Sequence, residues 1–229
     1  MVITNIVWLC AFGFLLHTSG YDNKILSHLG LAEPTVSTDW TAVSWESCLE
    51  KLDIDSDVVF FGDSITRGSS FQDYFEDLTI VNLGLTGDTI TKMQTRVGMI
   101  SAVNPEKIFI MAGVNDLNNY QGDLNVIVER YEVLLAEIKE ECPNVEIYIQ
   151  SILPVNTDMR GNSISNENIC ELNGLIKEMA EQKGIIFIDL YELYAVDGVM
   201  PEELTKDGIH LYDEAYERWA EAISEYVYG

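Results

Sequence analysis

Five short apolar runs recur along this chain, and longer amphipathic stretches separate them. Each run is rich in Val, Ile or Phe, which is typical of strands that are buried on both faces of a sheet. The runs cover residues 57–61, 79–83, 107–111, 146–153 and 185–190. The stretches 124–141, 166–183 and 213–226 carry apolar residues at helical spacing. Strands that alternate with helices predict an α/β fold with a parallel sheet and helices on both faces.

Ligands of such sheets bind beyond the carboxyl ends of the strands, so polar motifs at these ends are the candidate functional residues. The first apolar run leads directly into Gly62-Asp63-Ser64. A serine at a strand-to-helix turn lies at the mouth of the sheet, beside backbone N–H groups that the helix leaves unpaired. Gly62 is expected to permit a tight turn. The alternative is that Asp63 or Ser64 only caps the next helix.

Two further motifs follow the second and third runs. Asn82 and Gly84 follow the second, and Gly113-Val114-Asn115-Asp116 follows the third. A glycine lets its backbone N–H approach a substrate oxygen, and an asparagine amide can donate to a developing oxyanion. The alternatives are a plain turn at Gly84 and an Asx-turn at Asn115.

The last motif is Asp207-Gly208-Ile209-His210. The two other histidines, His17 and His28, precede the first strand run, so His210 is the one histidine in the body of the domain. An aspartate three residues earlier can orient the imidazole and stabilise its charged form. The alternative is a structural loop histidine. Taken together, the motifs supply a nucleophile, three oxyanion donors, a base and its orienting carboxylate, which is a complete acyl-transfer site.

These motifs resemble, in order and spacing, the four signature blocks of the SGNH (GDSL) hydrolases, over roughly residues 55–228. The stretch 148–156 is similar to the branch that contains platelet-activating-factor acetylhydrolase and sialate O-acetylesterase-like proteins. The resemblance implies a three-layer α/β/α sandwich with a five-stranded, flavodoxin-like parallel sheet. Arg67 departs from the branch, which often carries an acidic residue there, and this departure is expected to alter the mouth of the site.

The resemblance also implies a role for each motif residue. Ser64 is the expected nucleophile, and Asp207 and His210 complete the triad. The backbone N–H groups of Ser64 and Gly84 and the Asn115 side chain form the expected oxyanion hole. The supporting residues are Gly62, Asp63, Asn82 and Asp116.

The expected activity is a serine esterase that removes short acyl groups, acetyl foremost, from a carbohydrate or another small polar alcohol through an acyl-enzyme. It requires neither a metal nor an organic cofactor. No long apolar insertion interrupts the domain to shelter a fatty chain. The alternatives are a long-chain lysophospholipase or thioesterase, an acyltransferase that uses a sugar hydroxyl as acceptor, and a non-catalytic carbohydrate-binding or scaffold protein.

The charge balance limits which classes of molecule the protein is expected to bind. The chain has 38 Asp and Glu against 13 Lys and Arg, for a formal net charge of -25. Such a surface repels phosphate backbones, which argues against nucleic-acid binding. It also disfavours docking onto anionic lipid and favours a neutral saccharide over a strongly anionic one. The oligomeric state is left open.

The N-terminal apolar run, residues 6–16, is too short to cross a membrane. With the small residues that follow, it predicts a signal peptide over 1–20, a lead-in segment over 21–54 and a catalytic domain over 55–229. The protein is then secreted or extracytoplasmic, and the mature chain has no stable membrane insertion. No Lys or Arg precedes the run, so the alternative is a buried N-terminal helix in a cytoplasmic protein.

The four cysteines show neither a C-x-x-C pair nor metal-ligand spacing, so no zinc site is expected. Cys10 lies in the predicted leader. Cys48, Cys142 and Cys170 remain after cleavage, so at least one thiol stays free or pairs between chains.

Overall fold

A computed structural model describes residue 49 and residues 54–119, 123–160 and 164–229. Within them a five-stranded sheet has the order β2-β1-β3-β4-β5, and all four strand pairs are parallel. The strands are β1 Val58–Gly62, β2 Ile80–Asn82, β3 Lys107–Met111, β4 Glu146–Gln150 and β5 Ile186–Ile188. The predicted α/β fold with a flavodoxin-like strand order is therefore confirmed.

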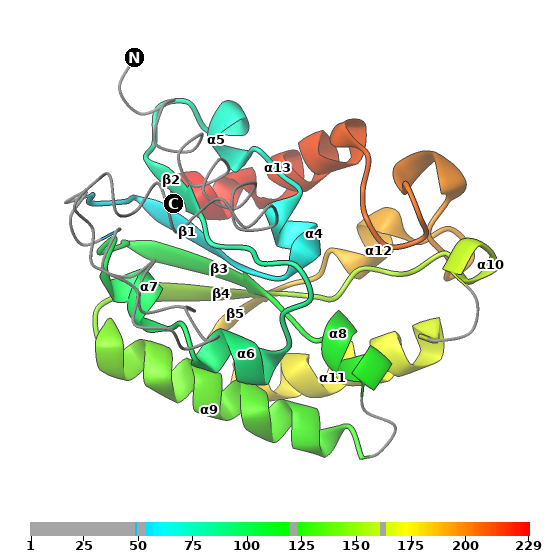
Figure 1. Cartoon of the computed structure of the whole chain (residues 1–229), viewed down its shortest axis with the longest axis horizontal. Coiled ribbons are helices and arrows are strands. Elements are labelled where there is room, and N and C mark those ends of the chain that lie inside the picture. The colour runs from blue at the N-terminus through cyan, green and yellow to red at the C-terminus, as the bar shows by residue number, and fades with distance from the viewer. Residues whose placement is uncertain (1–48, 50–53, 120–122, 161–163) are drawn as a thin grey trace, which may run out of the picture.

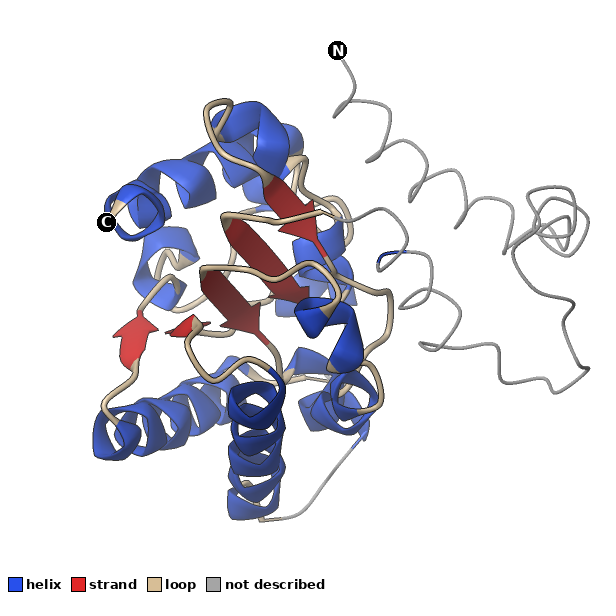
Figure 2. Ribbon diagram, turned by 90° about the vertical axis from the view of Figure 1, so that its left-hand side faces the viewer, coloured by secondary structure: helices blue, strands red, loops and turns tan. Residues whose placement is uncertain are grey.

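Helices cover both faces of this sheet, as Figures 1 and 2 show. One face is covered by α6 Ile90–Gln94, α7 Gly98–Ser101, α8 Val114–Asn119, α9 Asn125–Glu141 and α11 Asn166–Lys183. The other is covered by α4 Ser64–Arg67, α5 Phe71–Tyr74, α12 Tyr191–Tyr194 and α13 Asp213–Tyr228. The short α10 Thr157–Arg160 and the 3₁₀ turn η1 Glu202–Leu204 lie in the connections. The result is the expected three-layer α/β/α sandwich.

A row of aromatic rings forms the core on the α13 side of the sheet. Phe60, Phe109 and Tyr148 are register partners on β1, β3 and β4, and neighbouring rings in the row stack at 5.3 and 4.7 Å. Phe71 of α5 stacks on Phe60 at 3.7 Å and meets Trp219 of α13 edge-on at 5.4 Å. Aromatic pairs of this kind add to the free energy of area burial, so the row fixes α5 and α13 on the central strands.

Three of the apolar runs, 79–83, 146–153 and 185–190, extend beyond the carboxyl ends of β2, β4 and β5. The run 146–153 predicted a longer β4, but the strand ends at Gln150. The Asn173 side chain of α11 accepts from Ile152 N–H at 2.8 Å and donates to Ile152 C=O at 2.9 Å. Ser151 Oγ likewise accepts from Leu190 N–H at 2.8 Å, beyond β5. Side chains replace the ladder there while burial continues, so hydrophobicity alone could not locate the strand ends.

The strand order sets the position of the site. β1 has β2 on one side and β3 on the other, so the connections that leave β1 and β3 turn in opposite directions. A crevice opens at the carboxyl ends of the two strands where such a reversal occurs. Ser64 begins α4 directly after β1, and Asn115 lies in α8 shortly after β3. Both residues therefore lie at the topological switch point.

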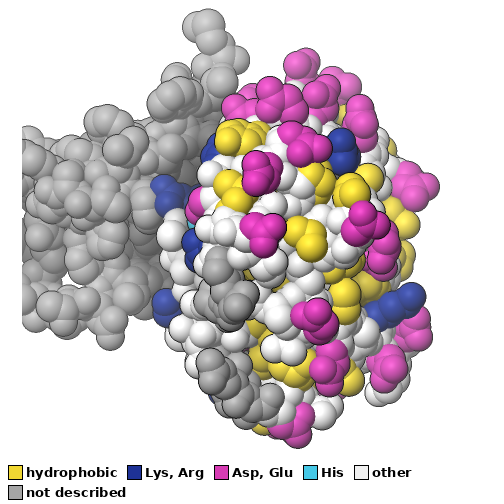
Figure 3. All heavy atoms as spheres, turned by 90° about the vertical axis from the view of Figure 1, so that its right-hand side faces the viewer, with side chains coloured by type: hydrophobic (Ala, Val, Ile, Leu, Met, Phe, Trp, Pro, Cys, Tyr) yellow, Lys and Arg dark blue, Asp and Glu magenta, His cyan; other side chains and the backbone are white. Residues whose placement is uncertain are grey.

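Several predictions concern other parts of the chain. The predicted signal peptide, most of the lead-in segment and Cys48 lie outside the described residues. Cys142 and Cys170 are free thiols. No described helix has the length and hydropathy that a membrane span needs. Acidic side chains are scattered over the face seen in Figure 3, as solvated surface residues should be.

Trp219 provides a test of the core. Its ring is fully buried and its Nε1 donates to Gln150 Oε1 at 2.6 Å. Trp219→Ala should lower the free energy of unfolding by about 3–5 kcal/mol in urea denaturation, because it leaves a cavity and an unpaired acceptor. Val133→Ala, at a side chain 49% exposed on α9, should change it by less than about 0.5 kcal/mol. A loss below about 1 kcal/mol for Trp219→Ala would contradict this view of the core.

Candidate active site

The turn between β1 and α4 presents Ser64. Asp63 is the N-cap of α4, and its Oδ1 accepts from Ile65 N–H at 2.9 Å. Ser64 is the first helical residue, so its own N–H is among those that a helix leaves without an intrahelical partner. Asp63 therefore does cap the helix, as the alternative reading of this motif held, and the cap also sets the orientation of Ser64.

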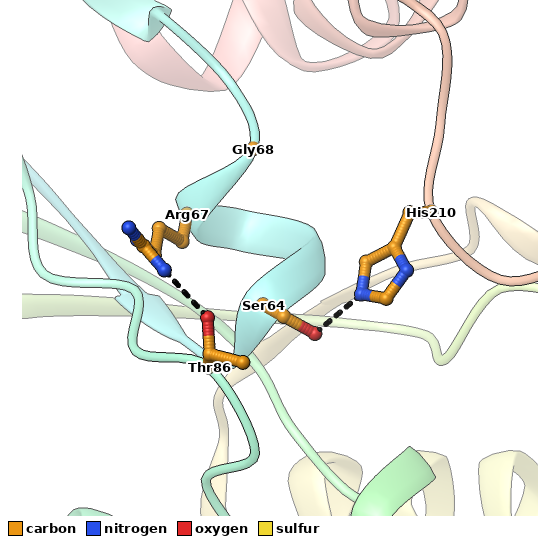
Figure 4. A pocket seen from close by; sticks show the side chains of 5 residues that line it. All are labelled: Ser64, Arg67, Gly68, Thr86 and His210. Atoms are coloured by element: carbon orange, nitrogen blue, oxygen red, sulfur yellow. Dashed lines mark hydrogen bonds between the residues drawn. The ribbon is translucent and has the colours of Figure 1, made fainter. Parts of the chain in front are cut away.

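Three side chains form a continuous chain of hydrogen bonds. His210 Nε2 lies 2.9 Å from Ser64 Oγ, and His210 Nδ1 lies 2.7 Å from Asp207 Oδ2. Because an ionised carboxylate only accepts, Nδ1 carries the proton and Nε2 accepts from the Ser64 hydroxyl. Figure 4 shows the Ser64 hydroxyl and the His210 imidazole directed at each other. This arrangement brings together residues that are 146 positions apart.

A tightly bonded loop holds His210 in place. Thr205 Oγ1 accepts from Gly208 N–H at 3.0 Å and donates to His210 C=O at 2.9 Å. Gly208 has a φ of +89°, and a Cβ there would meet Asn156 C=O at 2.8 Å. Only glycine combines that backbone angle with so close a neighbour. The Gly208 between the predicted aspartate and histidine is thus required by the loop.

Asp207 is held in its ionised form. Partial burial alone would raise its pKa, but hydrogen bonds from His210 N–H, the His210 ring and Ile209 N–H outweigh burial and lower the pKa of Asp207 below its usual value. Arg160 Nη1 lies 3.9 Å from Asp207 Oδ2. Since both of these side chains are more than a third exposed, that ion pair contributes little.

The predicted oxyanion donors converge on the same edge of the sheet, but two of them already have partners. Gly84 N–H donates to Asn82 Oδ1 at 2.9 Å. Asn115 Nδ2 donates to Asp88 C=O at 2.8 Å and lies 3.3 Å from Asp63 Oδ2. A substrate oxygen therefore has to share or replace these acceptors, as a three-centre hydrogen bond allows.

The two glycines of the site are needed for close packing. Gly62 does not have a positive φ, so its part in the short turn from β1 to α4 comes from its lack of a Cβ and not from a left-handed backbone. A Cβ on Gly62 would collide with the Thr66 side chain and lie 2.6 Å from Met111 C=O. A Cβ on Gly84 would meet the backbone of α4, including Arg67 Cα at 2.8 Å. Both residues let the β1 and β2 ends close against α4.

Asn82 and Asp116 support these turns. Asn82 Nδ2 donates to Thr66 C=O at 2.8 Å and to Ser69 C=O at 2.9 Å, which ties β2 to the end of α4. Asp116 is 1% exposed, and its Oδ2 accepts from Ile90 N–H at 3.0 Å at the start of α6. Through these hydrogen bonds each of the two side chains joins two segments that lie at the carboxyl edge of the sheet.

A buried charged group lies beneath the oxyanion donors. Arg96 Nε donates to Asp88 Oδ2 at 2.6 Å, with the two side chains 3% and 9% exposed. Burial raises the pKa of the neighbouring Asp63 to about 7, although the hydrogen bond from Ile65 N–H acts in the other direction. No role for Arg96 or Asp88 was predicted from the sequence. A signal was present, because Arg96 is the one charged residue among apolar neighbours at Met93, Val97 and Ile100.

The mouth of the site is an open hollow of about 290 Å³, lined by Ser64, Arg67, Gly68, Thr86 and His210. Arg67 Nη1 donates to Thr86 Oγ1 at 2.7 Å on its rim (Figure 4). Arg67 therefore lines the mouth, where its departure from the family pattern is expected to act. No cluster of three or more potential metal ligands occurs among the described residues.

The chain is similar in sequence to proteins that are named as esterases or acylhydrolases. The chain is 27% identical over 155 residues to the platelet-activating factor acetylhydrolase IB subunit beta homolog of Drosophila melanogaster, a match that spans 62% of this chain and 66% of that protein. It is 29% identical over 166 residues to a multidomain esterase of Ruminococcus flavefaciens, over 67% of this chain but only 20% of that protein. The chain thus spans less than two thirds of either relative.

The fold is shared with the solved lipase/acylhydrolase from Enterococcus faecalis. The TM-score is 0.66 at 22% identity, over 75% of this chain and 95% of that one. The family description of the GDSL-like lipases and acylhydrolases matches residues 60–218. This range contains Ser64, Gly84, Asn115, Asp207 and His210. The chain therefore belongs to the GDSL-like lipase/acylhydrolase family.

Proposed function

We propose that the chain is a serine esterase that hydrolyses short acyl esters, acetyl esters foremost, of a carbohydrate or another small polar alcohol. The observation that carries the proposal is the Ser64–His210–Asp207 chain of hydrogen bonds at 2.9 and 2.7 Å. These side chains lie at the topological switch point of the sheet, and the family to which the chain belongs is named for lipases and acylhydrolases. The Drosophila relative is named an acetylhydrolase and the Ruminococcus relative an esterase.

The proposed reaction proceeds through an acyl-enzyme. His210 Nε2 removes the Ser64 proton as Ser64 Oγ attacks the ester carbonyl, and Asp207 stabilises the resulting imidazolium. The imidazolium then protonates the leaving alcohol. Water, activated by His210, then attacks the acyl-serine and releases the acid. The N–H groups of Ser64 and Gly84 and the Asn115 amide hold the oxyanion of both tetrahedral intermediates.

The lining of the mouth supports a short acyl group. Its five residues present hydroxyl, guanidinium, imidazole and backbone groups and no large aliphatic side chain. A fatty chain needs a long apolar channel, because it gains about 0.8 kcal/mol for each buried methylene. This polar hollow therefore favours an acetyl ester over the long-chain lysophospholipase or thioesterase alternative.

Ser64→Ala should reduce kcat for p-nitrophenyl acetate to about 10⁻⁴ of the wild-type value or less, because no other group can form the acyl-enzyme. Ser70→Ala, at a neighbouring exposed serine that makes no capping hydrogen bond, is the matched control and should retain activity. Steady-state kinetics with circular dichroism as a check of folding is the measurement. More than a tenth of wild-type turnover in Ser64→Ala would exclude Ser64 as the nucleophile.

Asp207→Asn should lower kcat by about 10³–10⁴, because the amide no longer favours the Nδ1–H tautomer or the imidazolium. Steady-state kinetics with p-nitrophenyl acetate are the measurement, with circular dichroism as a check of folding.

The lowered pKa of Asp207 keeps the wild-type carboxylate ionised throughout the neutral range, so protonation of Asp207 should reduce the rate only in acid, well below neutral pH. Arg160→Gln is the control, and it should change kcat/KM by less than about fivefold because its ion pair is exposed. A kcat for Asp207→Asn within about tenfold of the wild-type value would show that another group orients His210.

The acyl preference is tested with p-nitrophenyl esters from acetate to decanoate. The value of kcat/KM should be highest at about two to four carbons and gain nothing beyond, whereas an apolar tunnel would give nearly fourfold for each buried methylene. Parallel assays with acetylated sugars, with and without an acceptor saccharide, separate hydrolysis from acyl transfer. A maximum at about eight carbons or more would favour the lysophospholipase or thioesterase alternative.

A further inference from the structure

Arg96 is a buried cation that makes three hydrogen bonds in three directions. Its side chain is 3% exposed and its guanidinium lies 4.2 Å from the centre of the Phe61 ring. Besides the bond to Asp88 Oδ2, Nη1 donates to Leu83 C=O at 2.7 Å and Nη2 donates to Gly62 C=O at 2.9 Å. Gly62 ends β1, directly before the turn to Ser64, whereas Leu83 and Asp88 both lie in the connection between β2 and α6 that also carries Gly84.

The bond to Leu83 acts on Gly84 directly. The C=O of Leu83 and the N–H of Gly84 belong to one planar peptide unit, and in a trans peptide they point in opposite directions. A guanidinium fixed on the oxygen therefore fixes the direction of the Gly84 N–H. It also polarises the unit, which makes that N–H a stronger donor.

The other two bonds act on Ser64 and Asn115. Gly62 C=O, which also accepts from Leu85 N–H at 3.0 Å, lies two residues before Ser64, so Arg96 fixes the turn that orients the Ser64 N–H. Asp88 is held by its carboxylate, and its backbone C=O accepts from Asn115 Nδ2 at 2.8 Å. One guanidinium thus fixes a neighbour of each of the three donors.

We infer that Arg96 is a positioning residue for the ester hydrolysis, which aligns the Ser64, Gly84 and Asn115 donors with the oxyanion without touching substrate. The inference rests on the proposed function. Only arginine has the planar fork that can reach three separated acceptors. A lysine in its place would supply its donors from a single nitrogen.

The test compares Arg96→Met and Arg96→Lys with a variant that is destabilised to the same extent elsewhere. Ile223→Ala is the matched control, because Ile223 is fully buried on α13 in the layer on the other side of the sheet. Assay temperatures are set at equal distance below each melting midpoint. Arg96→Met should lower kcat for p-nitrophenyl acetate by on the order of 10²-fold with KM changed less than about threefold, because misplaced donors act only in the transition state.

Arg96→Lys should also lose kcat, by at least about tenfold, while Ile223→Ala should stay within about threefold of wild type. If Arg96→Met does not fold, Arg96→Lys decides the question, since it retains a cation beside Asp88. The inference is overturned if the folded arginine variants keep kcat within the range of Ile223→Ala, or if their loss is confined to KM.

A double-mutant cycle with Asn115→Ala separates positioning from a general loss of stability. Asn115→Ala alone should cost about 10²–10³ in kcat. If Arg96 acts through the donors, the double variant Arg96→Met/Asn115→Ala should lose at least about tenfold less than the product of the single losses. Full multiplication of the two losses would contradict the inference. A wild-type protein no more active than Ser64→Ala would instead overturn the proposed function, and this inference with it.

Discussion

The parallel pairing of β1 with β2 on one side and β3 on the other is the constraint on which the site depends. It directs the carboxyl ends of the three strands to one edge, so that Ser64, Gly84 and Asn115 meet although they are far apart in the sequence. On one face of the sheet, the aromatic row of Phe60, Phe109 and Tyr148 holds β1, β3 and β4 in register. Geometry at the site is therefore a consequence of core packing several residues away.

Unlike the aromatic row, the buried ion pair of Arg96 and Asp88 beside the proposed oxyanion donors does not add to the stability of the fold. A buried ion pair gains little over apolar residues of the same volume, while removal of one partner costs about 3–5 kcal/mol. Asp88 and Arg96 are buried together, and burial raises the pKa of Asp63 to about 7. Such groups raise the free energy of the folded state unless each is bonded. They are bonded to Gly62, Leu83 and Asn115, which is consistent with the role inferred above for Arg96 in positioning the proposed donors.

Local periodicity predicted the buried strands, the helices and the layers, and the motifs after the strands predicted which residues meet at the edge of the sheet. The flavodoxin-like, five-stranded sheet was predicted from the resemblance to the SGNH hydrolases, because local periodicity does not set strand order. The stretch 166–183 coincides with α11, whose apolar stripe and Gly184 cap are both local signals. The end of β4 could not be predicted, because it depends on Asn173 from a helix that follows it. Gly62 and Gly84 were expected for local reasons, whereas their crowding comes from α4 and β3. Arg96 was missed because its three acceptors are brought together only by the fold.

If Ser64 is a nucleophile that His210 activates, it should react with a covalent reagent for activated serines. An alkyl fluorophosphonate phosphonylates an activated serine hydroxyl and releases fluoride. Peptide mapping by mass spectrometry after labelling of the wild-type protein should find one adduct, on the peptide that contains Ser64. Labelling should be lost in Ser64→Ala and strongly slowed in His210→Ala. An adduct on a different residue, or a labelling rate that does not depend on His210, would contradict the account.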